Sequence, residues 1–300
     1  MSFRSIIISN SASLSLKNNN LLINNGNEFL IPIEDISVLV IEGVSVNLTN
    51  RLLSKLSEYG VATIICDNKH LPTTLVMPLN THYKSFKVLK EQLNLTASFN
   101  KRIWQKVIKQ KIYNQGECLK LLNLHGDEFL KKLSESVESG DKGNKEAIGA
   151  KYYFKNIFGE KFIREDDMNC INSALNYGYT IFRSAIARTL VMYGFNPCLG
   201  VHHCNELNQF NLADDFIEPF RPIVDLWVYK NIKEDDILCK EHRIELVNLL
   251  NYECIIENKN HSILNAIEKM ISSYTTAVNN KDFRLLKVPI IKDLEYHAYE

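Results

Sequence analysis

The pattern of apolar and polar positions changes near residue 80. Before that point, short apolar runs alternate with Asn, Gly, Asp and Pro, a pattern typical of strands joined by turns. The runs are FRSIIIS, LSLK, NLLIN, EFLIP, ISVLVIEG, VATIICD and PTTLVMP. The sequence therefore predicts a small β-rich domain over residues 1–79.

One helix is expected to interrupt these strands. In VNLTNRLLSKLSEYG the leucines recur at helical spacing, Asn47 or Thr49 provides an N-cap, and Gly60 provides a stop. We expect this helix to pack on the sheet.

After residue 80 the apolar period becomes that of helices. The helical segments are YKSFKVLKEQL, the basic stretch after it, HGDEFLKKLSESV, EAIGAKYYFKNIF, INSALNYGYTIFRSAIARTLVMYG and HSILNAIEKMISSYTTAV. Residues 80–300 are therefore predicted to form a larger, mainly α-helical domain. The expected fold class is α+β, with the β-rich domain first.

Composition excludes several classes of protein. No apolar run approaches the roughly 20 residues that cross a bilayer, and the amino-terminal stretch is interrupted by Ser9, Asn10 and Ser11 where a signal peptide would be apolar. The seven cysteines include no CxxC pair, which favours free thiols in a reducing compartment. We expect a cytoplasmic protein without a membrane anchor.

Charge is balanced over the chain but not along it. The net charge is +0, whereas residues 81–111 contain a single acid, Glu91, among many cations. The cations are Lys84, Lys87, Lys90, Lys101, Arg102, Lys106, Lys109 and Lys111. Arg102, Lys106 and Lys109 recur at helical spacing, so one helix face is cationic. This face is either a solvated surface or a phosphate-binding stripe.

Residues 202–222, HHCNELNQFNLADDFIEPFRP, place a histidine pair before an acidic block. Asp215 and Glu218 are three residues apart and Asp214 and Glu218 are four apart, so helical spacing alone permits either aspartate to lie beside Glu218. Pro219 should bend or restart the helix at Glu218. These acids form either a site or a solvated helix face.

His203 is expected in a loop, where its imidazole could join the carboxylates in holding Mg²⁺ or Mn²⁺. Zinc on Cys198, His202, His203 and Cys204 is the alternative, although their spacing does not match a structural zinc pattern. A further acid, Glu146, begins the helix EAIGAKYYF, where small residues allow a helix or a phosphate to approach. Its placement could equally reflect the helix dipole.

These motifs carry a family resemblance. Glu146 with AIGAKYYF, the helix ALNYGYTIFRSAIAR and the block GVHHCNELNQFNLADDFIEPFRP together resemble the CRISPR-associated endonuclease and integrase of spacer acquisition, the larger of the two near-universal adaptation proteins. The resemblance covers essentially the whole chain and is closest to the type II branch. The NYGY segment is intact, which gives no sign of a degenerate copy.

The resemblance implies Glu146, His203 and Glu218 as metal ligands for Mg²⁺ or Mn²⁺, with Asp215 as a further catalytic acid that orients His203 or a metal-bound water. Asp214 falls on a variable position of the family motif. Arg221 is implied to contact an acid of the site or a phosphate. A DNA track is implied along the cationic residues, namely Lys84, Lys87, Arg102, Lys106, Lys109 and Arg221.

The resemblance also implies the reaction and the partners. A 3′-hydroxyl of captured double-stranded DNA, the prespacer, would attack a phosphodiester at the edge of a CRISPR repeat. The chain would form a homodimer through its β-rich domain and a heterohexamer with the small ferredoxin-like adaptation partner, alongside type II accessory and effector proteins. Two other functions stay open from the residues alone: a metal phosphodiesterase acting on small nucleotides, and a non-catalytic DNA scaffold.

Overall fold

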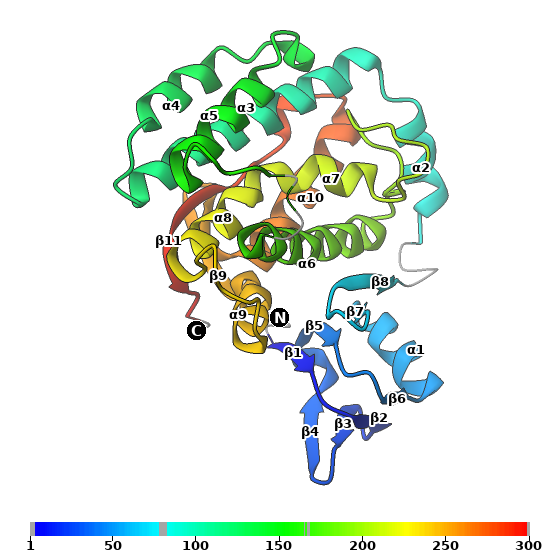
Figure 1. The fold of residues 1–300 in the computed structure, drawn as a ribbon. Helices are drawn as coiled ribbons and strands as arrows, with labels where there is room; N and C mark the ends of the chain where they lie inside the picture. Colours follow the sequence, from blue (N-terminus) through cyan, green and yellow to red (C-terminus); the bar gives the residue numbers. More distant parts are fainter. Residues whose placement is uncertain (1–3, 78–82, 165, 167–168, 299–300) are drawn as a thin grey trace. The chain divides into compact units, whose positions relative to one another are not determined.

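The computed structural model describes residues 4–77, 83–164, 166 and 169–298. The chain divides into two compact units, Met1–Tyr83 and Lys84–Glu300. The first unit is rich in strands and the second in helices (Figure 1), so the predicted α+β class is confirmed. The domain boundary predicted after residue 79 falls outside the described residues.

Two four-stranded sheets build the first unit. One sheet has the order β1-β5-β7-β8, with only β8 antiparallel to its neighbour, and the other has the order β4-β3-β2-β6. The strands are β1 (Arg4–Ile8), β2 (Ala12–Lys17), β3 (Asn20–Asn24), β4 (Glu28–Pro32), β5 (Ile36–Ile41), β6 (Val46–Leu48), β7 (Ala62–Cys66) and β8 (Pro72–Val76). All seven predicted runs form strands, whereas β6 is not predicted because its three residues lead directly into the expected helix.

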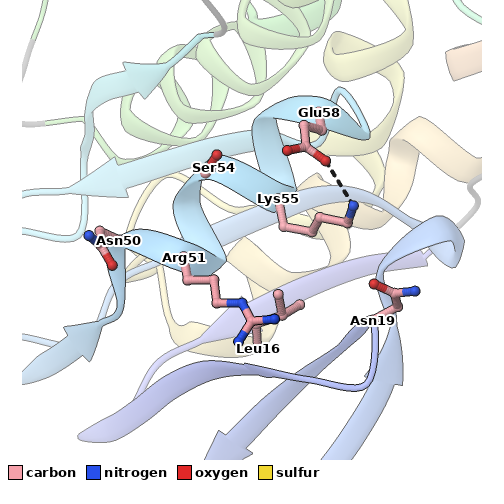
Figure 2. Close-up of a pocket in the computed structure, with 7 residues that line it drawn as sticks. All are labelled: Leu16, Asn19, Asn50, Arg51, Ser54, Lys55 and Glu58. Carbon is pink, nitrogen blue, oxygen red and sulfur yellow. Dashed lines mark hydrogen bonds and ion pairs between the residues drawn. The ribbon is translucent and has the colours of Figure 1, made fainter.

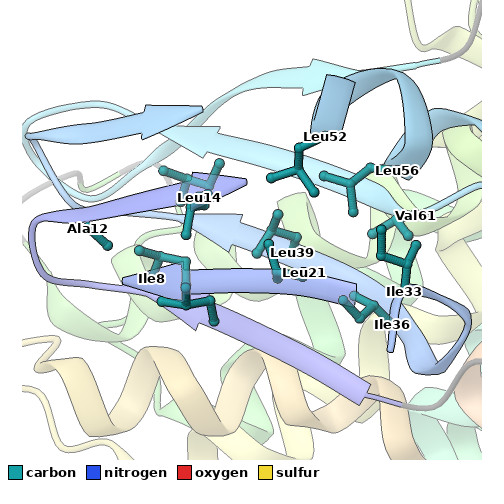
Figure 3. Close-up of a cluster of buried hydrophobic side chains, with 12 residues drawn as sticks. Ile8, Ala12, Leu14, Leu21, Ile33, Ile36, Leu39, Leu52, Leu56 and Val61 are labelled. Carbon is teal, nitrogen blue, oxygen red and sulfur yellow. The ribbon is translucent and has the colours of Figure 1, made fainter. Parts of the chain in front are cut away.

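Helix α1 (Asn50–Glu58) joins the two sheets through their shared core. The Thr49 hydroxyl accepts a hydrogen bond from the backbone N–H of Leu52, and the chain leaves the helix through Gly60 at φ 64°. Leu52 and Leu56 are fully buried in a cluster of side chains from both sheets (Figure 3). The predicted cap, stop and packing of this helix are confirmed.

Nine helices are described in the second unit. They are α2 (Ser85–Leu93), α3 (Ala97–Leu121), α4 (Asp127–Glu135), α5 (Lys145–Phe158), α6 (Cys170–Met192), α7 (Asn211–Ile217), α8 (Arg221–Asn231), α9 (Lys240–Asn248) and α10 (Ile263–Asn280). The sequence pattern does not predict α9 or a three-stranded antiparallel sheet of order β10-β9-β11. The strands β9 (Tyr252–Ile256), β10 (Lys259–Ser262) and β11 (Ile290–Tyr296) are short and carry charged residues, so their alternation is weak.

Helix α3 runs through the middle of the second unit. It packs against α4, α5, α8 and β11, and Trp104, Ile108 and Ile112 on its apolar side are essentially inaccessible to solvent. Figure 1 shows α4 and α5 beside it. Any residue on α3 is therefore held in place from several sides.

A close helix contact fixes α6 against α8 and α9. Gly178 of α6 faces Val224 of α8 and Leu246 of α9, and a Cβ atom on Gly178 would lie 2.5 Å from Val224 Cγ1 and 3.2 Å from Leu246 Cδ2. Glycine is therefore required by space and not by backbone conformation.

We predict that Gly178→Ala lowers the free energy of unfolding by about 1–3 kcal/mol, because the added methyl overpacks the contact with α8. Helix propensity alone predicts the opposite sign, a gain of about 1 kcal/mol. Urea denaturation measures the change, and Val224→Ala in the same chain should restore much of the loss. An unchanged or higher stability for Gly178→Ala would contradict the close packing.

Candidate functional site

The loop between α6 and α7 is organised by the carboxylate of Asp215. This side chain is inaccessible to solvent and lies on α7. Its Oδ2 accepts the backbone N–H groups of Val201 and His202 at 2.6 and 3.1 Å, and its Oδ1 accepts that of His203 at 3.1 Å. One buried acid therefore determines the path of the histidine loop.

The same carboxylate orients the imidazole of His203. Nδ1 of His203 lies 2.8 Å from Oδ1 of Asp215, and this hydrogen bond raises the pKa of His203 above its ordinary value. The ring packs edge-on against Trp104, on whose face His202 stacks at 4.1 Å. With Nδ1 engaged by Asp215 and 42% of the side chain exposed, Nε2 is the ring nitrogen left for a ligand.

The acidic segment is bent and buried. A 3-10 turn, Glu218–Phe220, separates α7 from α8, which confirms the break predicted at Pro219. A solvated acidic face is wrong, because Asp215, Glu218 and Asp225 are all buried where the segment packs against α3 and α6. Asp225 accepts a hydrogen bond from the hydroxyl of Tyr179, and burial raises the pKa of Asp225 to about 6.

Glu218 is held between two cations. Its Oε1 accepts a hydrogen bond from Nε of Arg221 at 2.9 Å, and its Oε2 lies 2.5 Å from Nζ of Lys111. Burial alone would raise the pKa of Glu218, but the charges of Arg221 and Lys111 lower it to about 2. Glu218 is therefore ionised at neutral pH in spite of being buried.

Glu146 reaches the same lysine from another helix. The carboxylate of Asp141 accepts the backbone N–H groups of Lys145 and Glu146 at 2.9 and 3.0 Å, which fixes the start of α5. Gly149 allows α5 to approach α3, since its Cβ position lies 3.3 Å from Ile112 Cγ1. Nζ of Lys111 then lies 2.7 Å from Oε1 of Glu146.

Sequence reasoning gives Lys111 no role of its own. It belongs to the basic stretch, yet it lies one heptad after Trp104 and next to Ile112, on the buried side of α3. A lysine at a position where the helical pattern places apolar residues is the signal that could have identified it. Burial would lower its pKa, but Glu218 and Glu146 raise it, so the ammonium stays charged.

The structure brings two of the three predicted ligands to one point, and the third lies nearby. Glu146 and Glu218 share Lys111, and the charge of Glu218 contributes to the raised pKa of His203. Among the described residues, no group of three or more His, Cys, Asp or Glu side chains is spaced to hold a metal ion. Metal binding by Glu146, His203 and Glu218 therefore stays a prediction.

The remaining sequence candidates have separate positions. Asp214 accepts a hydrogen bond from Asn208 at 2.7 Å and lies 3.8 Å from Arg183. The thiols of Cys198 and Cys204 donate to neighbouring oxygen atoms of the loop. All seven cysteines are free.

The cations predicted to bind DNA differ in their exposure and in their contacts with other residues of the protein. Arg221 binds Glu218 and lies over the ring of Tyr179 at 4.5 Å. Lys106 is only partly exposed and donates to the backbone carbonyl of Arg284 at 2.9 Å, while Arg102 lies over the ring of Phe283. Lys84 and Lys87 are exposed at the start of α2, and Lys109 is partly exposed.

Each unit has a hollow in its surface. Figure 2 shows one in the first unit, lined by α1 and neighbouring strand and turn residues, with an ion pair of 2.8 Å between Lys55 and Glu58. Its lining contains none of the predicted site residues. The other, of about 240 Å³, lies beside His203 and includes Gly200, Cys204 and Tyr274 in its lining.

In the part of the chain that the structure describes, no helix has the length and apolar character needed to span a bilayer.

Comparison with known proteins identifies a relative over the full length of the chain. The family model "CRISPR associated protein Cas1" matches residues 6–251. The CRISPR-associated endonuclease Cas1 of Neisseria meningitidis serogroup C is 42% identical over 305 residues, which cover 100% of both chains.

Solved structures share the fold at low sequence identity. A casposase bound to its integration product covers 93% of both chains with a TM-score of 0.75 and 19% identity. A chain of a Cas6-RT-Cas1–Cas2 complex matches 97% of this chain and 36% of its own length, with a TM-score of 0.74 and 20% identity. From the family match and the full-length relative, we conclude that this chain belongs to the Cas1 family of CRISPR-associated proteins.

Proposed function

We propose that this chain is a metal-dependent DNA endonuclease and integrase that inserts captured DNA into a CRISPR array. One observation supports this most directly: two carboxylates from separate elements meet at one buried cation, beside a histidine that an aspartate orients. The full-length relative is named an endonuclease, and a structural neighbour was solved with an integration product. Both names fit chemistry at a phosphodiester.

The donor set fits Mg²⁺ or Mn²⁺. Glu146 and Glu218 supply oxygen atoms, and His203 supplies Nε2, a combination suited to these ions. Oε2 of Glu218 is buried and, among the described residues, faces only an ion pair with Lys111 and no aligned hydrogen-bond donor. Such an atom is well placed to become a ligand. A bound ion would stabilise negative charge on the transferring phosphate and on the leaving oxygen.

The protein's own groups prepare this reaction. Asp215 fixes the tautomer and direction of His203 and anchors its loop. Arg221 holds Glu218 in its ionised form. During transfer, the 3′-hydroxyl oxygen of the captured DNA bonds to phosphorus, and the phosphodiester bond at the repeat edge breaks. The attacking hydroxyl loses its proton and the leaving 3′-oxygen gains one.

The proposed partners are DNA and other proteins. We propose a homodimer that works with the small adaptation protein, since structural neighbours include chains of Cas1–Cas2 complexes. A prokaryotic cytoplasmic location and assignment to a type II system belong to the same proposal. Lys84, Lys87, Arg102 and Lys109 are the cations that we propose to follow a DNA backbone.

Loss of a single proposed ligand should abolish strand transfer. We predict that Glu146→Gln, His203→Ala and Glu218→Gln each reduce transfer of a prespacer into a repeat-containing plasmid. Each loss should exceed about 10–100-fold, which is the loss typical of a residue that only supports a metal ligand. Glu117→Gln, which removes a carboxylate paired with Lys131 at 2.8 Å, is the control and should retain activity. Thermal melting checks that each variant folds. Full transfer by any folded ligand variant would contradict the site.

The two adjacent aspartates should differ. Asp215→Asn should reduce strand transfer about 10–100-fold, because the amide cannot accept all the N–H groups that Asp215 now accepts and His203 loses its orientation. Asp214→Asn should stay near the parent rate, since it contacts Asn208 at the edge of the site. The measurement is the rate of strand transfer at saturating Mn²⁺. Equal losses in both variants would contradict this ordering.

The cationic face of α3 should contribute electrostatic DNA binding. We predict that replacing Arg102, Lys106 and Lys109 with Gln weakens binding of any duplex and flattens its salt dependence by about 0.9 for each phosphate that is no longer neutralised. Lys106 donates to Arg284, so we expect its share to be smaller than that of the other two. Titration of labelled duplex at several salt concentrations measures the slope, with Lys120→Gln as the control. An unchanged slope would show that this face is a solvated surface that does not contact DNA phosphates.

A further inference from the structure

The ammonium of Lys111 is a buried charge in the second unit that no sequence motif explains. Its side chain is 10% exposed, and Nζ lies 2.7 Å from Glu146 and 2.5 Å from Glu218. Both partners are proposed metal ligands, and they come from α5 and from the turn between α7 and α8. A single protein cation therefore lies where the two carboxylates converge.

Lys131 provides a comparison within the same unit. It too bridges two acids, Glu117 at 2.8 Å and Asp127 at 3.5 Å, but its side chain is 28% exposed and neither acid belongs to the site. A bridging lysine at the surface adds little, because solvent screens the pair. Two carboxylates that meet at one buried point repel each other strongly unless a cation lies between them.

The net charge of the cluster determines how strongly it would attract an entering ion. The two carboxylates are balanced by Lys111 and Arg221, so the four groups sum to zero. A divalent ion added to this neutral cluster gains little attraction. It gains the attraction of two carboxylates only when the ammonium leaves them, since Lys111 and the ion need the same oxygen atoms.

We propose that Lys111 is a positioning residue that holds Glu146 and Glu218 together in the absence of metal, and that an entering divalent ion must displace its ammonium from them. The proposal rests on the metal site of the proposed function. Lys111 would give the metal-free protein a preassembled pair of carboxylates. It would also lower the affinity for the ion below that of the two carboxylates without the lysine.

Lys111→Met tests the proposal, because methionine keeps much of the length of the side chain and removes its charge. Calorimetric titration with Mn²⁺ alone should give a dissociation constant about tenfold lower than that of the parent. This factor corresponds to one charged hydrogen bond, which the ion must break in the parent but not in the variant. The melting temperature should be lower than the parent's without metal and should recover on adding Mn²⁺. Lys131→Met is the matched control and should bind Mn²⁺ like the parent.

The outcomes separate this proposal from the proposed function. If the parent binds Mn²⁺ and Lys111→Met binds it equally or more weakly, Lys111 does not compete with the ion and the proposal is overturned. If the parent shows neither binding heat nor stabilisation by Mn²⁺, the metal site of the proposed function fails and this proposal fails with it.

A second measurement needs no variant, in case Lys111→Met does not fold. In the parent labelled with ¹⁵N-lysine, the ammonium resonance of Lys111 should shift when Mg²⁺ is added, while that of Lys131 should not. A Lys111 resonance that stays in place while Mg²⁺ binds would overturn the displacement.

Discussion

The shared ammonium of Lys111 is the interaction on which the site depends. It ties α3 to α5 through Glu146 and to the turn after α7 through Glu218. Removing one member of this cluster leaves the others with fewer opposite charges to offset the cost of their burial. The position of these three elements relative to one another is therefore coupled to the charge balance of the site.

Asp215 provides the second constraint on the site. Its carboxylate anchors the backbone of residues 201–203 and orients the ring of His203. Structure and chemistry are linked in this one side chain, since the bonds that shape the loop also select which ring nitrogen faces outward. Gly200 is part of the same arrangement, because a Cβ atom there would lie 2.8 Å from Oδ2 of Asp215.

Much of the fold could be predicted from local pattern, but the burial of the acids could not. The strand runs, the Thr49 cap and the break at Pro219 depend on neighbouring residues, so the sequence contains their cause. A helical pattern distinguishes two sides of a segment but not whether both are covered, which is why an acidic face is compatible with solvent on pattern alone. In the sheet of β9, β10 and β11, the pairing of β11 with β9 joins strands far apart in sequence.

The site itself was only partly predictable. Spacing places Asp214 and Asp215 equally near Glu218, and the choice between them comes from family resemblance. Lys111 has no motif of its own, because its role arises from contacts between elements.

The most direct test of the metal site and of the displaced lysine is the anomalous X-ray signal of Mn²⁺ in crystals of this protein. We expect one strong peak bounded by Glu146, Glu218 and Nε2 of His203, with the Lys111 ammonium moved away. A bound Mn²⁺ at any other position, with Lys111 still between the two carboxylates, would contradict this expectation.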